Sequence, residues 1–394
     1  MMDAAHFDPL GAERSEDLWS CLRELRGGPV AKTNEYGGIW LVTKYEDVTK
    51  AARDYGTFCG SHGAGPVPRA DVGEVKLVPI ETDPPVHRAY RKLIDPYLRP
   101  DSVAAAEGTI RSLAIDLLDR LAASQARDFV AEFAVPFPVN TFFAFGVDVD
   151  EAGMVMGWLD SLLMKPSAIA KGRVHEADAI LKLYNWTHGL LQRRRTEPAR
   201  GDVIDSLLHG TVEGRELSDP ERMMIVMNLL GGGLETTTNA LGSMVYHLAR
   251  RPELRSRLDT DRSLIPAAVE EFLRLDAPAP GVGRTSTCPV SLGQAMIPAG
   301  ERAILYYGSA NRDPAAFENP DEIDLDRYTG RCKPHLTFGT GPHFCPGAHL
   351  ARMELCVALE EILDRLGEFR LASPSVRFSN GITRGPLSLP LAFG

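Results

Sequence analysis

One ten-residue stretch, FGTGPHFCPG from Phe338 to Gly347, constrains the fold more than any other part of the sequence. It places a single cysteine, Cys345, in a glycine-rich loop directly before an apolar-periodic segment that predicts a helix. A helix N-terminus offers backbone N–H groups and the positive end of its dipole to a negative charge. Glycines let the backbone turn tightly and approach a ligand closely. The loop is therefore suited to hold Cys345 as a thiolate.

The spacing of this loop is F-x-x-G-x-H/R-x-C-x-G, and through it the chain resembles the cytochrome P450 family. In that family the cysteine is the thiolate ligand of a haem iron. The resemblance implies haem b, with Cys345 on the iron, Phe338 and Gly347 beside the cofactor and His343 against a propionate. A lone cysteine is more often an ordinary buried thiol. That interpretation is kept for Cys21, Cys59, Cys288, Cys332 and Cys356.

The composition is that of a soluble globular protein. The chain has 394 residues, of which 44% are hydrophobic and 24% charged, and it contains no obvious linker, charge block or repeat. We therefore expect residues 1–394 to form a single haem domain with no fused reductase. The formal net charge of −10 argues against a general nucleic-acid binder. Because no C-x-x-C pair is present, the cysteines predict neither a disulfide scaffold nor a zinc site.

The sequence predicts a cytoplasmic protein that does not enter a membrane. Its opening, MMDAAHFDPLGAERSEDLW, lacks the basic start and apolar core of a signal peptide. The longest apolar run, from Met223 to Leu234, includes Asn228 and three glycines and is too short to cross a bilayer. We expect the chain to act as a monomer.

Hydrophobic periodicity predicts a mainly α fold with a minor β part. Alternation around 38–43 indicates strands, and a Gly/Pro-rich loop follows over about 60–79. From Pro84 to about Arg274 apolar residues recur every three or four positions, as in amphipathic helices. Small strands are expected from Thr285 to Tyr307, and a last helix should end near Leu366. The resemblance implies a single-domain fold that holds haem between a long central helix and the cysteine loop with the last helix.

A capping box and three successive glycines mark the expected central helix. Ser218, followed three residues later by Glu221, predicts its N-terminus. The helix then contains Gly231 to Gly233, and each glycine costs about 1 kcal/mol relative to alanine in a helix interior. A combined cost of about 3 kcal/mol requires a packing or functional reason.

The segment from Gly232 to Thr237 resembles the oxygen-binding part of the central helix in the P450 family. The resemblance implies that Gly232 and Gly233 let the helix pass close to the haem. Glu235 and Thr236 match the family's acid–alcohol pair. Thr236 would hydrogen-bond dioxygen or a nearby water, and Glu235 would relay protons from solvent. The plain alternative is a Gly-rich packing face followed by a Thr-rich turn.

Glu271 and Arg274, in VEEFLRL, match the E-x-x-R motif of the family. An exposed pair at this spacing would stabilise a helix by only a few tenths of a kcal/mol and would carry no information. The resemblance implies that the pair is instead buried. Arg327, in IDLDRY, would join it from the coil before the cysteine loop and hold that coil in place.

Four more residues match family positions that contact haem propionates. His87 and Arg91, in DPPVHRAYRKL, lie four residues apart and therefore share one helical face. Arg284 follows the sequence PGVG, and His335 precedes Phe338 by three residues. Each alone would pass for a solvated surface residue, but their order along the chain supports the resemblance.

Pro346 departs from the family, which usually has an apolar residue with a backbone N–H directly after the cysteine. Proline suits the first position of a helix, but it removes one donor that could reach the sulfur of Cys345. A thiolate with fewer hydrogen bonds donates more electron density to iron, which should lower the reduction potential. The alternative is that Pro346 only rigidifies the turn.

The resemblance implies a haem-thiolate monooxygenase that inserts one atom of O₂ into a substrate. Electrons would come from NAD(P)H through a ferredoxin or flavodoxin and its reductase, because the chain has no reductase domain. The basic residues expected to attract this acidic carrier are Arg88, Lys92, Lys333 and Arg352. A peroxide-driven enzyme, or one performing nitration, C–C coupling or dehydration, remains open, although the acid–alcohol pair disfavours peroxide. A non-catalytic haem sensor or electron carrier would not need that pair.

Substrate contacts are expected, by family position, from a loop before Pro79, the central helix, the strand at Arg284 and the C-terminal tail. These positions are mostly apolar, which predicts a small apolar or aromatic organic substrate. The candidate residues are Val67, Leu77, Leu230, Leu234, Val282, Ile382 and Thr383.

Overall fold

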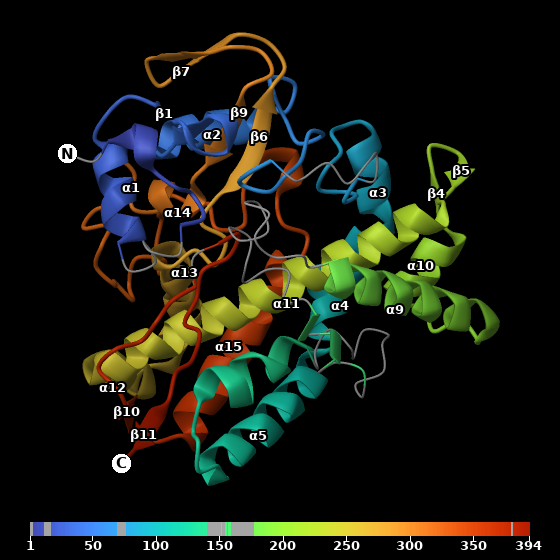
Figure 1. Cartoon of the computed structure of the whole chain (residues 1–394). Coiled ribbons are helices and arrows are strands. Elements are labelled where there is room, and N and C mark those ends of the chain that lie inside the picture. The colour runs from blue at the N-terminus through green and yellow to red at the C-terminus, as the bar shows by residue number, and fades with distance from the viewer. Residues whose placement is uncertain are drawn as a thin grey trace.

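The computed structural model describes residues 3–11, 17–68, 76–139, 151, 154–155, 157–158, 177–379 and 381–394. Helices dominate it, and the strands are short (Figure 1). The helices are α1 (Leu18–Arg26), α2 (Tyr45–Arg53), α3 (Val86–Ile94), α4 (Pro100–Ala104), α5 (Glu107–Ala123), α9 (Ala177–Thr196), α10 (Val203–His209), α11 (Asp219–Arg250), α12 (Pro252–Thr260), α13 (Ile265–Leu275), α14 (Tyr307–Ala310) and α15 (Ala348–Arg365). The strands are β1 (Ala31–Thr33), β2 (Ile39–Val42), β3 (Phe58–Cys59), β4 (Thr211–Val212), β5 (Arg215–Glu216), β6 (Val282–Ser286), β7 (Val290–Leu292), β8 (Ala295–Ile297), β9 (Arg302–Leu305), β10 (Phe369–Leu371) and β11 (Leu391–Phe393).

Helix α11 crosses the middle of the molecule (Figure 1) and, at 32 residues, is about 48 Å long. Its N-terminus carries the predicted capping box: Ser218 Oγ accepts from the Glu221 backbone N–H, and the Glu221 carboxylate accepts from the Ser218 N–H at 2.7 Å. The helix continues without a break through Gly231 to Gly233. The glycines therefore remove side-chain bulk from α11 without interrupting it.

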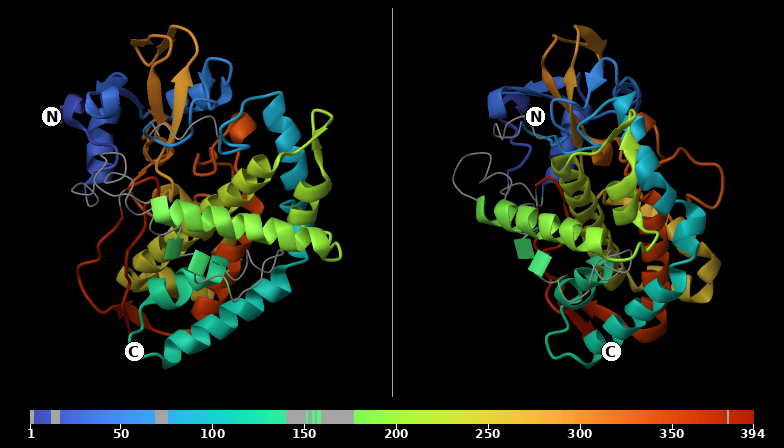
Figure 2. Two further views of the ribbon diagram at one scale, coloured as in Figure 1. Left: turned by 45° about the vertical axis from the view of Figure 1, so that its right-hand side comes forward. Right: turned by 90° about the vertical axis from the view of Figure 1, so that its right-hand side faces the viewer.

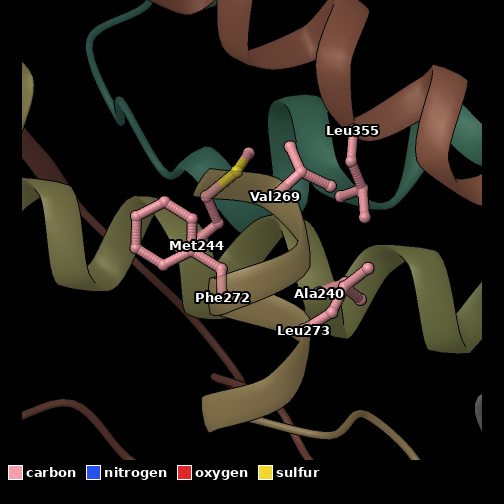
Figure 3. A pocket seen from close by; sticks show the side chains of 6 residues that line it. All are labelled: Ala240, Met244, Val269, Phe272, Leu273 and Leu355. Carbon is pink, nitrogen blue, oxygen red and sulfur yellow. The ribbon is translucent and has the colours of Figure 1, made fainter. Parts of the chain in front are cut away.

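The main hydrophobic core lies where α15 packs with α5, α11 and α13. Figure 3 shows a gap in this core that is too narrow to admit a water molecule. Interiors packed this closely resist movement and transmit strain, so the bundle forms a firm base for the loop that precedes α15. The gap is lined by Ala240 and Met244 of α11, Val269, Phe272 and Leu273 of α13, and Leu355 of α15.

A five-stranded sheet lies beside α1 and α2 at the other side of the molecule (Figure 2). Its order is β1-β2-β9-β6-β3; β2 and β9 run parallel, and the other neighbours run antiparallel. The loop before α3 lies directly on β6, because the Gly283 N–H donates to Ala64 O at 2.9 Å. A Cβ at Gly283 would lie only 2.0 Å from Gly65 O. The sheet thus places Arg284, the next residue of β6, against that loop.

The predicted mainly helical fold with a minor β part is confirmed. Strands occur around 38–43, where alternation predicted them, and between Val282 and Leu305, close to the expected range from Thr285 to Tyr307. In the part of the chain that the structure describes, no helix has both the length and the apolar character needed to span a bilayer.

Candidate active site

Cys345 sits in a closed loop between a 3₁₀ turn at Gly341–His343 and the start of α15. Its backbone N–H donates to Phe338 O at 2.9 Å, which closes the loop. Gly341 has a φ of 76°, and a Cβ there would lie 2.9 Å from Ala52 O, so both backbone conformation and space require glycine. The loop motif is therefore fixed by packing against α2 as well as by the cysteine.

Burial raises the pKa of the Cys345 thiol, while a hydrogen bond from the Gly347 N–H and the positive charges of Arg91 and Arg352 lower it. The net shift is upward, so the protein surroundings alone do not make this group a thiolate. A metal ion deprotonates a coordinating thiol outright. Pro346 has no N–H, which leaves Gly347 as the adjacent donor to the sulfur.

Helix α3, strand β6 and the cysteine loop bring His87, Arg284 and His343 together. The rings of His87 and His343 lie 4.4 Å apart between centroids. Burial, together with the nearby His343 and Arg91, lowers the pKa of His87 to about 4. His87 and Arg284 are 2% and 3% exposed. Three candidate propionate contacts therefore form one buried, electropositive cluster.

This cluster fits the carboxylates of a haem. Buried His87 Nδ1 has no hydrogen-bond partner among the described residues, and buried polar atoms normally have one. The Arg284 guanidinium donates to Gly283 O at 2.7 Å, and no carboxylate in the described ranges pairs with it. An uncompensated buried cation is costly. Two propionates would supply both the missing acceptor and the missing negative charge.

Asp83 supports the cluster from the start of the DPP sequence. Its carboxylate lies 3.3 Å from His343 Nε2 and accepts from the Gly60 and Ser61 N–H groups at 3.0 and 3.1 Å. Burial raises the pKa of Asp83, but these hydrogen bonds outweigh it and lower that pKa to about 2. Sequence reasoning gave Asp83 no role, although the matched motif begins at this residue.

Arg91 contacts the cysteine loop itself. Its guanidinium donates to Phe344 O at 2.9 Å, next to Cys345, and forms an ion pair with Asp95. Arg91 therefore ties α3 to the loop and adds positive charge near His87.

One face of α11 is open at the glycines. Apart from the adjoining residues and the backbone of the helix itself, no atom of the described chain lies within 4 Å of the Cβ position at Gly231, Gly232 or Gly233. Thr236 lies one turn after Gly232, and its hydroxyl donates to Gly232 O at 2.7 Å. Gly232 and Gly233 are exposed although α11 is largely buried on either side of them. We call the strip through Gly232 and Thr236 the open face of α11.

The prediction that Leu230 and Leu234 line the pocket is wrong. Both are fully buried in a second hydrophobic cluster with residues of α3, α9 and α10. At 100° per residue they lie on the opposite side of α11 from Gly232 and Thr236. Leu229 has the same helical phase as Gly232, but it is half-buried and packs against the cluster that holds Leu230 and Leu234.

Glu235 lies beside the open face and is 7% exposed. Its Oε1 accepts a hydrogen bond from the hydroxyl of Thr383 at 2.5 Å. The polar group of Thr383 is thus directed at Glu235, and the lining of the substrate pocket by Thr383 stays a prediction. Two residues further along α11, the Thr237 hydroxyl donates to Glu354 at 3.4 Å.

Glu271, Arg274 and Arg327 form a buried ion-pair triad. The Arg274 guanidinium makes two hydrogen bonds to the Glu271 carboxylate, at 2.7 and 2.8 Å, and Arg327 Nε donates to the same carboxylate at 3.0 Å. Glu271 and Arg274 are both 0% exposed. Arg274 also donates to the carbonyls of Asn311 and Pro320, at 2.8 and 2.7 Å. The triad thus secures the coil that leads to the cysteine loop.

Glu270 contradicts two predictions: that His335 contacts a propionate and that Arg352 attracts the electron carrier. His335 Nε2 lies 3.1 Å from its carboxylate, and His335 Nδ1 accepts from the Thr337 N–H at 3.2 Å. No nitrogen of His335 is left for a propionate. Arg352 makes two hydrogen bonds to the same carboxylate, at 2.6 and 2.8 Å, and lies over the Phe338 ring. It is therefore a poor candidate for attracting an electron carrier.

The other candidate substrate contacts are only partly placed. Val67, Leu77, Val282 and Ile382 are all half-buried, and their contact with substrate stays a prediction. Val282 is the first residue of β6, two positions before Arg284. The middle of the predicted pocket loop, residues 69–75, lies outside the described residues.

Known proteins are similar to this chain over nearly its whole length. The cytochrome P450 family model matches residues 181–377. Cytochrome P450 130 of Mycobacterium tuberculosis is 35% identical over 397 residues, spanning 96% of each chain. A mutant of P450 EryK in complex with erythromycin B superposes with a TM-score of 0.88 at 31% identity over 98% of each chain. The testosterone complex of CYP109E1 from Bacillus megaterium gives a TM-score of 0.86 at 27% identity, covering 97% of this chain and 99% of that one.

Proposed function

The chain belongs to the cytochrome P450 family, and from that premise we propose that it oxidises a small apolar or aromatic organic molecule. Family membership makes it a haem-thiolate monooxygenase with iron protoporphyrin as cofactor. When bound, haem supplies the activation of O₂, which no side chain can perform. We further propose that residues 1–394 act as one domain.

The proposal assigns haem binding to residues from α3, β6 and the cysteine loop. Cys345 would ligate the iron, and Gly347 would hydrogen-bond its sulfur. His87, Arg284 and His343 would hold the propionates, and Arg91 would keep the loop in place. The observation that carries this assignment is the buried electropositive cluster with the unpartnered Nδ1 of His87.

Glu235 and Thr236 would deliver the protons that the reaction consumes. Thr236 lies on the open face of α11, where its hydroxyl can accept or donate a proton. Glu235 is buried next to it and can pass a proton from its carboxyl group to that hydroxyl or to a water between them. A buried relay excludes bulk water, which protects the site from side reactions.

The substrate would enter between the open face and the residues bordering it. Val67, Leu77, Val282 and Ile382 are apolar and half-buried. An apolar lining favours an apolar ligand. The testosterone bound by CYP109E1 belongs to that class.

Electrons would come from NAD(P)H through a separate ferredoxin or flavodoxin. Arg88 and Lys92 are exposed on α3, the helix that contacts the cysteine loop through Arg91. Lys333 is exposed in the coil before that loop. Positive groups on this side would attract an acidic carrier and speed its association.

The decisive experiment compares Cys345→Ser with wild type in the reduced, carbon-monoxide-bound state. Wild type should show the red-shifted Soret band of a thiolate-ligated haem, and Cys345→Ser should lack it. Cys356→Ser is the matched control, since Cys356 is a half-buried thiol on α15 that the proposal leaves unused. A Cys345→Ser protein with the wild-type band would refute the assignment. Substrates would then be sought by displacement of the water ligand, seen as a spin-state change.

A further inference from the structure

The C-terminal tail covers the face of α11 that adjoins the open face. Glu235, Asn239 and Gly242 recur at intervals of four and three residues and therefore share one side of the helix. A Cβ at Gly242 would lie 2.6 Å from Pro386 Cγ, and a Cβ at Gly385 would lie 2.2 Å from Asn239 Oδ1. The glycines thus allow tail and helix to approach as closely as backbones can.

Thr383 lies at the end of this contact and meets Glu235. The two side chains are 4% and 7% exposed, and the hydroxyl–carboxyl distance is 2.5 Å. They are 148 residues apart in sequence. A glutamate carboxyl can rotate about three bonds, and burying it against a fixed donor restricts that rotation.

The tail itself is held from two sides. The Arg384 N–H donates to Pro278 O at 2.7 Å, and its guanidinium lies 3.7 Å from the Asp276 carboxylate and over the Trp19 ring. Ser379 closes the tail on itself, because its N–H donates to Gly385 O at 2.8 Å. Thr383 is therefore presented to Glu235 by a fixed backbone and not by a free loop.

We propose that Thr383 is a positioning residue for proton delivery by Glu235. Its hydroxyl holds the carboxyl group of Glu235 at the edge of the open face, in the orientation from which a proton reaches Thr236 or a water beside it. Proton transfer depends steeply on donor–acceptor geometry, so a carboxyl free to rotate delivers protons more slowly. This inference rests on the proposed role of Glu235.

The test uses Thr383→Val, which removes the hydroxyl and keeps the branched shape. Haem-loaded protein is supplied with NADPH, a ferredoxin and ferredoxin reductase, and its oxygen consumption is measured in H₂O and in D₂O. Thr383→Val should consume oxygen about tenfold more slowly, with a larger solvent isotope effect. Thr383→Ser keeps the hydroxyl and should restore both values. Should Thr383→Val fail to fold, Thr383→Cys, with a much weaker donor, takes its place.

A second readout does not depend on turnover. The infrared carboxyl band of Glu235, identified by difference with Glu235→Gln, should shift in Thr383→Val and stay in place in Thr383→Ser. Thr238→Val is the matched control: Thr238 is also buried, but its hydroxyl donates to Ala134 O at 2.9 Å. A merely structural effect of losing a buried hydroxyl would appear in Thr238→Val as well.

The outcomes separate this inference from the proposed function. If Glu235→Gln leaves oxygen consumption and its isotope effect unchanged, the role of Glu235 fails and the inference falls with it. If Glu235→Gln slows consumption while Thr383→Val matches wild type in rate, isotope effect and infrared band, only the inference is overturned. Slowing in both, with no further loss in the double variant, supports it.

Discussion

Replacing Asp276 by asparagine should destabilise the whole chain, because this residue joins five separate segments. Its carboxylate lies 2.6 Å from His247 Nε2 at the end of α11 and accepts from Trp19 Nε1 of α1 at 3.1 Å. Arg312 and Arg384 approach the same carboxylate at 3.4 and 3.7 Å. Burial raises the pKa of Asp276, but His247 and the two guanidinium groups together outweigh it and hold that pKa below its ordinary value.

The magnitude follows from the burial of the partners. Arg312 and Arg384 are 8% and 7% exposed, and Asp276→Asn would leave both near a neutral amide, with Arg312 keeping its ion pair to Asp321 at 2.9 Å. Removing one partner of a buried ion pair costs about 3–5 kcal/mol. Unfolding entropy is about 2.1 cal/mol/K per residue, or about 0.8 kcal/mol/K for 394 residues. The midpoint of thermal unfolding should therefore fall by about 4–6 °C.

The assay is thermal unfolding of the haem-loaded protein at pH 7, followed by circular dichroism. Because the folded pKa of Asp276 is lowered, its stabilisation is complete above the unfolded value of about 4 and is lost as the pH falls below it. Asp326→Asn is the matched control, since Asp326 pairs with Arg257 at an exposed site and its loss should leave the midpoint unchanged. A midpoint for Asp276→Asn equal to that of Asp326→Asn would refute the reasoning.

Three further changes test other parts of the structure. Burial raises the pKa of Glu270, but hydrogen bonds from Arg352 and His335 outweigh it and lower that pKa to about 2. Glu270→Gln should therefore lower the free energy of unfolding in urea by about 3 kcal/mol at pH 7, and this loss should disappear as the pH falls from about 4 to 2. Pro346→Leu adds a backbone N–H beside the sulfur and should raise the haem reduction potential by tens of millivolts in a redox titration; an unchanged potential would contradict it. Gly385→Ala places a Cβ against the Asn239 side chain and should lower the free energy of unfolding by about 1–3 kcal/mol. A variant as stable as wild type would show that the tail can shift to accommodate the added methyl group.

Sequence reasoning succeeded where a few neighbouring residues determine the structure. The capping box at Ser218 and the mainly helical fold follow from spacing within a single element. It failed where the partner lies far along the chain. His335 turns to Glu270, 65 residues away, and Thr383 turns to Glu235, so neither spacing nor composition could reveal the contact. Leu230 was misplaced for a different reason: it was assigned by family position, without regard to helical phase.

The same residue types make two kinds of buried charge cluster in this chain, and the difference between them is physical. Around Asp276 the cations Arg312 and Arg384 face a protein carboxylate, so the charges are matched within the fold and the cluster stabilises it. Around Arg284 the neighbours are His87, whose pKa of about 4 leaves it neutral near pH 7, and His343, with which Asp83 is paired, so no carboxylate in the described ranges matches the guanidinium. Unmatched burial raises the free energy of the chain alone, and a bound dianion recovers it. Whether a buried charge is matched by its own protein therefore distinguishes a structural cluster from a binding site, and only the three-dimensional arrangement contains that information.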